Sequence, residues 1–208
     1  MKNVYESLEE KILSGEYKIG EQITENRIST ELGVSRTPVR EALMMLEKDG
    51  LVDLIPNKGA VVRGVSTDDL IDIYNIRKRL EGLAASLAAR RIDEKGVEEL
   101  SEIVELSEFF ISKNDAEKLK KLDSDFHARI YFYSGSRMLE KVLSDLHRSI
   151  GSYRKKSLLN PGRLEKSVKE HRTILEAIKA GNAEKADELA SLHVGAALDN
   201  LLMLEGLK

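Results

Sequence analysis

Four histidines, all in the second half of the chain, are the side chains best suited to metal binding. His171 falls in the middle of the apolar stripe of a predicted helix over 163–180, and His193 in the middle of the stripe of a helix over 183–205. His171 lies ten residues before the turn at Gly181 and His193 twelve after it. At a rise of about 1.5 Å per residue, the two imidazoles reach a similar height in a helical hairpin. We therefore expect them to converge.

Asp123 and His127 supply a second pair of donors. They are one turn apart on a predicted helix over 115–133, on one flank of its apolar stripe, whereas Asp125 points away from His127. Three imidazole nitrogens and one carboxylate oxygen suit zinc, nickel or manganese. His147 lies off the apolar centre of its helix and is left out of this set. The alternative is that each histidine is an ordinary hydrogen-bonded residue of the core or surface.

Arg77 and Glu81 share the inward face of a long predicted helix over 66–91. One interpretation is a buried ion pair between positions i and i+4. The other is an effector site, in which Arg77 binds the carboxylate of a small organic acid and Glu81 orients the guanidinium group.

A different chemistry is predicted near the N-terminus, where a helix over 35–49 begins with Ser35, Arg36, Thr37 and Arg40. Arginine can donate two hydrogen bonds to guanine, and hydroxyl groups suit phosphates or bases. The sequence also contains a local basic cluster, which consists of Arg27, Arg36, Arg40, Lys58 and Arg63. The alternative is an ordinary solvated helix face.

The elements that carry these residues fall into two groups. Apolar spacing predicts helices over 3–14, 24–32 and 35–49, followed by β-favouring stretches at 51–55 and 60–63. This order of helices and hairpin is typical of a winged helix-turn-helix. From Ser66 onwards the pattern is helical only, and the breaks define six helices in an antiparallel bundle: 66–91, 94–112, 115–133, 137–158, 163–180 and 183–205. The fold is thus mainly α, with a DNA-binding domain over 1–64 and an all-α domain over 65–208.

Composition and charge limit the classes of function. The 208 residues are 41% apolar and 33% charged, without cysteine. We find no apolar run of about 18 or more residues and no signal-peptide core, so we expect a cytoplasmic protein without a membrane span. Residues 1–64 carry nine basic and eleven acidic residues, a net charge of −2. DNA binding would therefore depend on the local basic cluster.

The signature of the GntR family of bacterial repressors is closely resembled by residues 32–43, LGVSRTPVREAL. Residues 46–52, LEKDGLV, and 56–62, PNKGAVV, continue the resemblance, which covers 4–63 without a gap. It implies DNA contacts from Ser35, Arg36, Thr37 and Arg40, and from the wing tip, Asn57, Lys58 and Gly59, in the minor groove. A further contact, which is an arginine in some relatives, falls on Asn26, beside Arg27.

A second resemblance involves residues 123–127, DSDFH, residues 170–178, EHRTILEAI, and residues 192–193, LH. They look like the FCD ligand-binding domain of the FadR subfamily, in its shorter, VanR-like six-helix form. Many members bind a metal through one aspartate and three histidines at matching positions, here Asp123, His127, His171 and His193. Similar members also place an arginine at the position of Arg77.

The sequence therefore predicts a DNA-binding repressor with a divalent metal, zinc or nickel before manganese. A small carboxylate effector would modulate its affinity for the operator. A homodimer would place two recognition helices on a pseudo-palindromic duplex. Two alternatives stay open: a metal-dependent enzyme acting on a small carboxylate, which would need a general base near an open metal position, and a repressor whose metal is purely structural.

Overall fold

The computed structural model describes residues 3–56, 58–158, 160 and 162–204. The chain forms two compact units, Met1–Leu70 and Ile71–Lys208. The sequence places the boundary at 64–65, in the linker before the first long helix. The structural division lies a few residues later, inside that helix.

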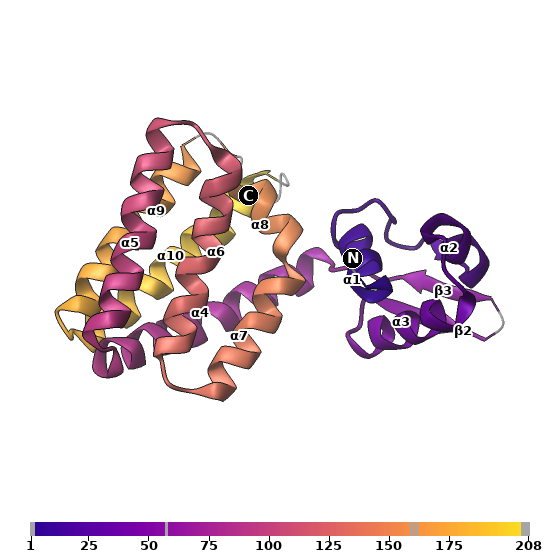
Figure 1. The fold of residues 1–208 in the computed structure, drawn as a ribbon, viewed down its shortest axis with the longest axis horizontal. Helices are drawn as coiled ribbons and strands as arrows, with labels where there is room; N and C mark the ends of the chain where they lie inside the picture. The colour runs from indigo at the N-terminus through magenta and orange to yellow at the C-terminus, as the bar shows by residue number, and fades with distance from the viewer. Residues whose placement is uncertain (1–2, 57, 159, 161, 205–208) are drawn as a thin grey trace. The chain divides into compact units, whose positions relative to one another are not determined.

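Three helices build the N-terminal unit: α1 (Val4–Leu13), α2 (Glu25–Leu32) and α3 (Arg36–Lys48). Asn3 and Glu6 form a capping box at the start of α1, and the Thr24 hydroxyl caps α2. α3 packs against both other helices (Figure 1). Its buried residues are Val39, Ala42, Leu43 and Leu46. Burial of this stripe leaves the opposite face of α3 exposed to solvent.

A small antiparallel sheet completes the unit, with β2 (Val52–Ile55) and β3 (Gly59–Val62) as the predicted hairpin. A third strand, β1 (Gln22–Ile23), pairs with the other edge of β3, so that the order is β1-β3-β2. The sequence did not predict β1, because two residues are too few to show alternation. Tertiary pairing defines it: Ile23 is fully buried opposite Ala60.

The second unit is all-helical. Its helices are α4 (Thr67–Arg91), α5 (Glu94–Ser112), α6 (Ala116–Tyr133), α7 (Arg137–Ser149), α8 (Gly151–Leu158), α9 (Arg163–Lys179) and α10 (Ala183–Leu204). α5 packs against α6 and α9, and α9 against α10 (Figure 1). α4 contributes small buried residues, Ala84, Ala85 and Ala88, to the core formed by these helices.

The segment 137–158, expected as one helix, is interrupted between α7 and α8. Ile150 is fully buried and has left the helical conformation, with φ −109° and ψ 15°. Gly151 follows, and glycine is a poor residue for a helix interior. The six expected helices of this unit are therefore seven among the described residues. The predicted fold class, a winged helix-turn-helix followed by an all-α domain, is confirmed.

Candidate metal centre and nucleic-acid interface

The predicted donor set comes together inside the helical unit. Asp123 and His127 lie on α6, His171 on α9 and His193 on α10, and all four are buried. Their ligand atoms lie within 4.8 Å of one another. The convergence predicted for the α9–α10 hairpin therefore occurs, and α6 brings the other two donors to the same point. The arrangement can hold a metal ion.

Two of the imidazoles are oriented by carboxylates on neighbouring helices. His127 Nδ1 lies 2.8 Å from Glu81 Oε2, and His193 Nδ1 lies 2.7 Å from Glu170 Oε2. A carboxylate at Nδ1 favours the tautomer that leaves a lone pair on Nε2, as in metal-bound histidines. The two Nε2 atoms are 3.2 Å apart. Two lone pairs at this distance repel each other unless they share a cation, so the donor set fits a metal ion.

The surroundings of His171 also fit a metal ligand. Its ring stacks on Phe126, with centroids 4.1 Å apart, and its Nε2 lies 3.6 Å from Asp123 Oδ1. Among the described residues, Nε2 has no hydrogen-bond partner although it is buried. A buried polar atom without a partner is uncommon in proteins, and here it belongs to the donor set itself.

Electrostatics keep these donors in the protonation states that a metal requires. Burial lowers the pKa of His171 and His193, which favours neutral imidazole. Burial alone would raise the pKa of Asp123, but the Arg154 guanidinium beside it outweighs this effect and holds the pKa below its usual value. At neutral pH, Asp123 is therefore a carboxylate, and His171 and His193 are neutral imidazoles, as metal binding requires.

The expected effector residues lie beside the donor set. Arg77 Nη2 is 2.6 Å from Glu81 Oε1, and both side chains are almost fully buried. The ion pair between positions i and i+4 is therefore real, but Glu81 also contacts His127 through its second oxygen, Oε2. Arg77 Nη1 keeps no hydrogen-bond partner among the described residues.

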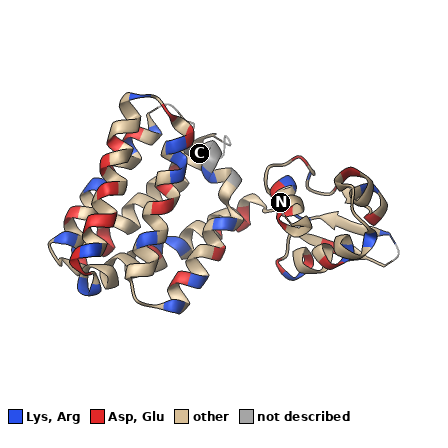
Figure 2. Cartoon of the chain, viewed as in Figure 1, with Lys and Arg blue, Asp and Glu red and all other residues tan. Residues whose placement is uncertain are grey.

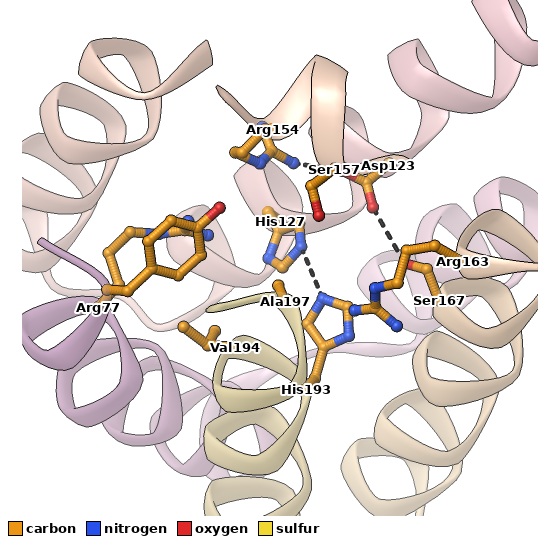
Figure 3. A pocket seen from close by; sticks show the side chains of 11 residues that line it. Arg77, Asp123, His127, Arg154, Ser157, Arg163, Ser167, His193, Val194 and Ala197 are labelled. Carbon is orange, nitrogen blue, oxygen red and sulfur yellow. Dashed lines mark hydrogen bonds and ion pairs between the residues drawn. The ribbon is translucent and has the colours of Figure 1, made fainter. Parts of the chain in front are cut away.

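A small cavity of about 20 Å³ adjoins these groups, with room for about one water molecule. Figure 3 shows the side chains that line it, from several helices. Three of the lining residues are arginines: Arg77, Arg154 and Arg163. Besides Arg77 Nη1, two other buried donors here lack a hydrogen-bond partner within the described chain, Tyr74 OH and Arg163 Nε.

Sequence reasoning missed several residues of this site. Arg154, on α8, contacts both Asp123 and His147, and Arg163 Nη1 lies 2.9 Å from Glu170 Oε2. His147, which the sequence places outside the donor set, is also outside it in the structure, yet its ring centroid is only 5.5 Å from that of His127. Glu170 is the neighbour of His171 in the sequence, but this adjacency does not show that the Glu170 carboxylate contacts His193.

The expected DNA-contacting residues lie in the N-terminal unit. Asn26, Arg27, Ser35, Arg36, Thr37, Arg40 and Lys58 are all exposed. Ser35 is the N-cap residue of α3, and its hydroxyl accepts no capping hydrogen bond. Gly59 lies at the start of β3 with φ +94°. Asn57 lies outside the described residues. Exposure at the start of α3 is what a recognition helix requires.

Acidic side chains neutralise several of these arginines. Both Nε and Nη2 of Arg40 donate to the Glu25 carboxylate at 2.8 Å. Arg27 Nη1 donates to Glu21 Oε1 at 2.6 Å. Figure 2 shows acidic and basic residues interspersed on the helices of this unit. Arg63 of the same cluster lies 3.6 Å from Asp53, so three of the five basic residues of this cluster are in ion pairs.

A winged helix-turn-helix together with an all-helical domain is the architecture of a bacterial transcriptional regulator. Two family patterns match the chain: "Bacterial regulatory proteins, gntR family" over residues 1–62 and "FCD domain" over residues 72–196. The chain belongs to the GntR family of bacterial regulatory proteins and carries an FCD domain, as in the FadR-like subfamily. It is a transcriptional regulator and not an enzyme.

Known relatives agree with this assignment. The "Uncharacterized HTH-type transcriptional regulator YdhC" of Bacillus subtilis is 32% identical over 91% of this chain and 85% of that protein. The "Probable D-xylose utilization operon transcriptional repressor" of Paenarthrobacter nicotinovorans is 28% identical over 90% and 82% of the respective chains. The solved structure of E. coli McbR/YncC superposes with a TM-score of 0.78, at 25% identity, over 97% of this chain and 96% of that chain.

The described residues contain no helix both long and apolar enough to span a bilayer.

Proposed function

We propose that this protein is a sequence-specific repressor whose FCD domain binds a divalent metal and a small organic acid, and that the acid changes the affinity for the operator. The protein acts as a homodimer joined through the helical domains, in the cytoplasm, on a pseudo-palindromic operator. The observation that carries the ligand-binding part is the buried cluster of one aspartate and three histidines.

Asp123, His127, His171 and His193 would hold the metal, and this mixed nitrogen and oxygen set suits zinc or nickel, with manganese possible. When bound, the metal would act as a Lewis acid that accepts an oxygen of the effector. Glu81 and Glu170 orient two of the imidazoles through their Nδ1 atoms.

Arg77 is the proposed partner of the effector's carboxylate. Glu81 fixes its Nη2 and Nε, which leaves Nη1 as a buried donor without a partner in the described chain. Arginine positioned in this way binds carboxylates through charge-assisted hydrogen bonds. A metal on one side and Arg77 on the other define an effector with at least one carboxylate.

Metal content and operator binding test the proposal together. Purified wild-type protein should contain about one equivalent of zinc or nickel, and Asp123→Asn should contain little. Asp125→Asn is the matched control, since Asp125 lies two residues away but outside the donor set. Equal metal content in all three proteins would contradict the assigned ligands.

The remaining alternative is a metal that only stabilises the fold. Chelation should then lower the melting temperature, while candidate acids leave operator affinity unchanged both with and without metal. Under our proposal, at least one small carboxylate changes operator affinity in the metal-loaded wild type, and this response is lost in Asp123→Asn.

A further inference from the structure

The basic residues of the N-terminal cluster differ in whether a carboxylate already holds them. Arg27, Arg40 and Arg63 lie in ion pairs with acidic side chains. The other two, Arg36 and Lys58, are exposed and form no ion pair within the described chain. A cation of this kind can neutralise a DNA phosphate without first losing a carboxylate, and it releases counterions when it does so. Lys58, on the hairpin, is thus free for a new contact with DNA.

The backbone of Lys58 is hydrogen-bonded on both sides, although its side chain is exposed. Its N–H donates to the carbonyl oxygen of Ile55 at 3.0 Å, across the turn between β2 and β3. Its own carbonyl oxygen accepts a hydrogen bond of 2.9 Å from Nε2 of Gln22, on β1. One strand therefore holds Lys58 through its main chain, and another strand holds it through a side chain. These two bonds fix the point from which the Lys58 side chain extends into solvent.

The side chain of Gln22 extends the attachment of β1 beyond its own short ladder. The two residues of β1 pair with Val61 and Ala60 of β3, so this ladder does not reach Lys58. Gly59 brings the hairpin against the β1 backbone, because it has no Cβ to meet it. Next to this close approach, the Gln22 amide is the group through which β1 binds Lys58. The end of the hairpin is therefore tied to both of its neighbouring strands.

We propose that Gln22 is a positioning residue for DNA binding: its side-chain amide holds the hairpin so that the Lys58 ammonium group binds a phosphate of the operator. Gln22 touches no DNA in this arrangement and acts only through Lys58. The inference rests on the proposed function, because it requires that the winged unit binds an operator. It adds to the DNA-binding machinery a residue that lies outside both the hairpin and the start of α3.

A neutral side chain that acts in this way changes the salt dependence of DNA binding. Each phosphate that the protein neutralises contributes about 0.9 to the slope of log affinity against log salt concentration. Gln22 carries no charge, so its substitution by another neutral residue removes no cation from the protein. A smaller slope after such a substitution therefore reports a phosphate contact that has been lost at a cationic residue, and Lys58 is the cation that Gln22 holds.

Gln22→Met tests this in the full chain, since methionine has a similar length but no amide donor. The probe is the duplex that the wild type selects from a random-sequence pool, and fluorescence anisotropy gives the affinity at several salt concentrations. Gln22→Met should bind this duplex about threefold to tenfold more weakly, with a slope smaller by about 0.5–0.9. Ser14→Ala is the matched control, because it also removes an exposed hydrogen bond from a side chain to a backbone carbonyl, that of Lys11. It should bind like the wild type.

A double-mutant cycle with Lys58→Ala shows whether Gln22 acts through Lys58. Lys58→Ala keeps the carbonyl oxygen that Gln22 binds and removes the ammonium group, so the slope should fall by about 0.9. In this background, Gln22→Met should weaken binding by less than about twofold. Equal losses from Gln22→Met in both backgrounds, or an unchanged slope in Gln22→Met alone, would overturn the proposal.

The outcomes distinguish this inference from the proposed function. A selected duplex that wild type and Gln22→Met bind equally keeps the proposed function and overturns the role of Gln22. Urea denaturation of Gln22→Met should match that of the wild type, because the hydrogen bond is exposed. A loss of stability without a change in the salt slope would show a purely structural role and also overturn the inference. Failure of the wild type to select any sequence contradicts both proposals.

Discussion

At the scale of single residues, the histidine rings are held by carboxylates from other parts of the helical unit. Helical spacing was enough to place His171 and His193 on inward stripes and to choose Asp123 over Asp125. It could not identify Glu81 and Glu170 as partners of imidazoles, because those contacts depend on how α4 packs near α6 and α9 near α10. Arg154 was missed for a related reason: α8 shows no apolar stripe from which its direction could be read.

Glu170→Gln tests the role of these carboxylates. The substitution removes the charge that orients His193 and pairs with Arg163, so zinc affinity should fall by about tenfold or more. Competition with a chromophoric chelator measures this. Glu165→Gln, an exposed position in the first turn of the same helix, should leave the affinity unchanged. Equal losses in both variants would show a general effect of charge.

Proton uptake should destabilise the helical unit in mildly acidic solution. Burial lowers the pKa of His171 and His193 from the usual 6.5, so below that pH the unfolded chain binds protons that the folded imidazoles do not. With chelator present, the free energy of unfolding should be level above about pH 7 and fall as the pH decreases from about 6.5 to 5. Urea denaturation measures it. His171→Gln removes one of these groups and should flatten the slope; parallel slopes would argue against the assignment.

Arg36→Ala addresses reading of the operator. Arg36 is exposed in the first turn of α3, and an arginine that binds a guanine contributes to specific binding beyond its charge. Operator affinity should fall by about 1–3 kcal/mol, while affinity for random duplex falls less. Fluorescence anisotropy over a series of salt concentrations separates the two. Equal losses on both duplexes would mean that Arg36 contacts phosphate only.

At the scale of elements, the helices were largely predictable, and the short pieces between them were not. Apolar periodicity and caps define long helices, whereas β1 exists only because Ile23 finds Ala60 across the sheet. The break between α7 and α8 could not be predicted either. Ile150 continues the apolar spacing of a helix, but in the structure it is buried in a non-helical conformation.

Gly59→Ala tests how closely the wing is attached to β1. Gly59 has φ +94°, and a Cβ there would lie 2.2 Å from the backbone oxygen of Ile23. The substitution should lower the free energy of unfolding of the N-terminal unit by about 1–3 kcal/mol. Gly20→Ala is the control, since Gly20 also has a positive φ (+83°) but no atom near its Cβ position. A larger loss for Gly20→Ala in urea denaturation would refute the steric explanation.

At the scale of the whole molecule, α4 connects the two functions along the chain. It begins at Thr67, shortly after the wing, and carries both Arg77 and Glu81. A ligand bound at Arg77, as proposed, would therefore act on the helix that continues directly from the DNA-binding unit. The order of the elements could be predicted from the sequence, because each element was assigned from the pattern of its own stretch of residues.

A homodimer on DNA predicts a fixed stoichiometry. Two protomers should bind one duplex that carries both half-sites, and scrambling one half-site should reduce affinity by more than about tenfold. Sedimentation of the labelled duplex with protein measures the mass of the complex. A single protomer on an intact operator would exclude the dimeric arrangement.

The ion pairs of Arg27 and Arg40 have a consequence for how the regulator searches the chromosome. An arginine that already holds a glutamate gains little from a random phosphate, because one ion pair merely replaces another. We therefore expect fewer counterions to be released, so that affinity for bulk DNA is low and depends weakly on salt. Such a protein is not sequestered by the large excess of other sequences. Occupancy of the operator would then depend on the few base contacts whose free energy compensates for the ion pairs of Arg27 and Arg40 that are broken on binding.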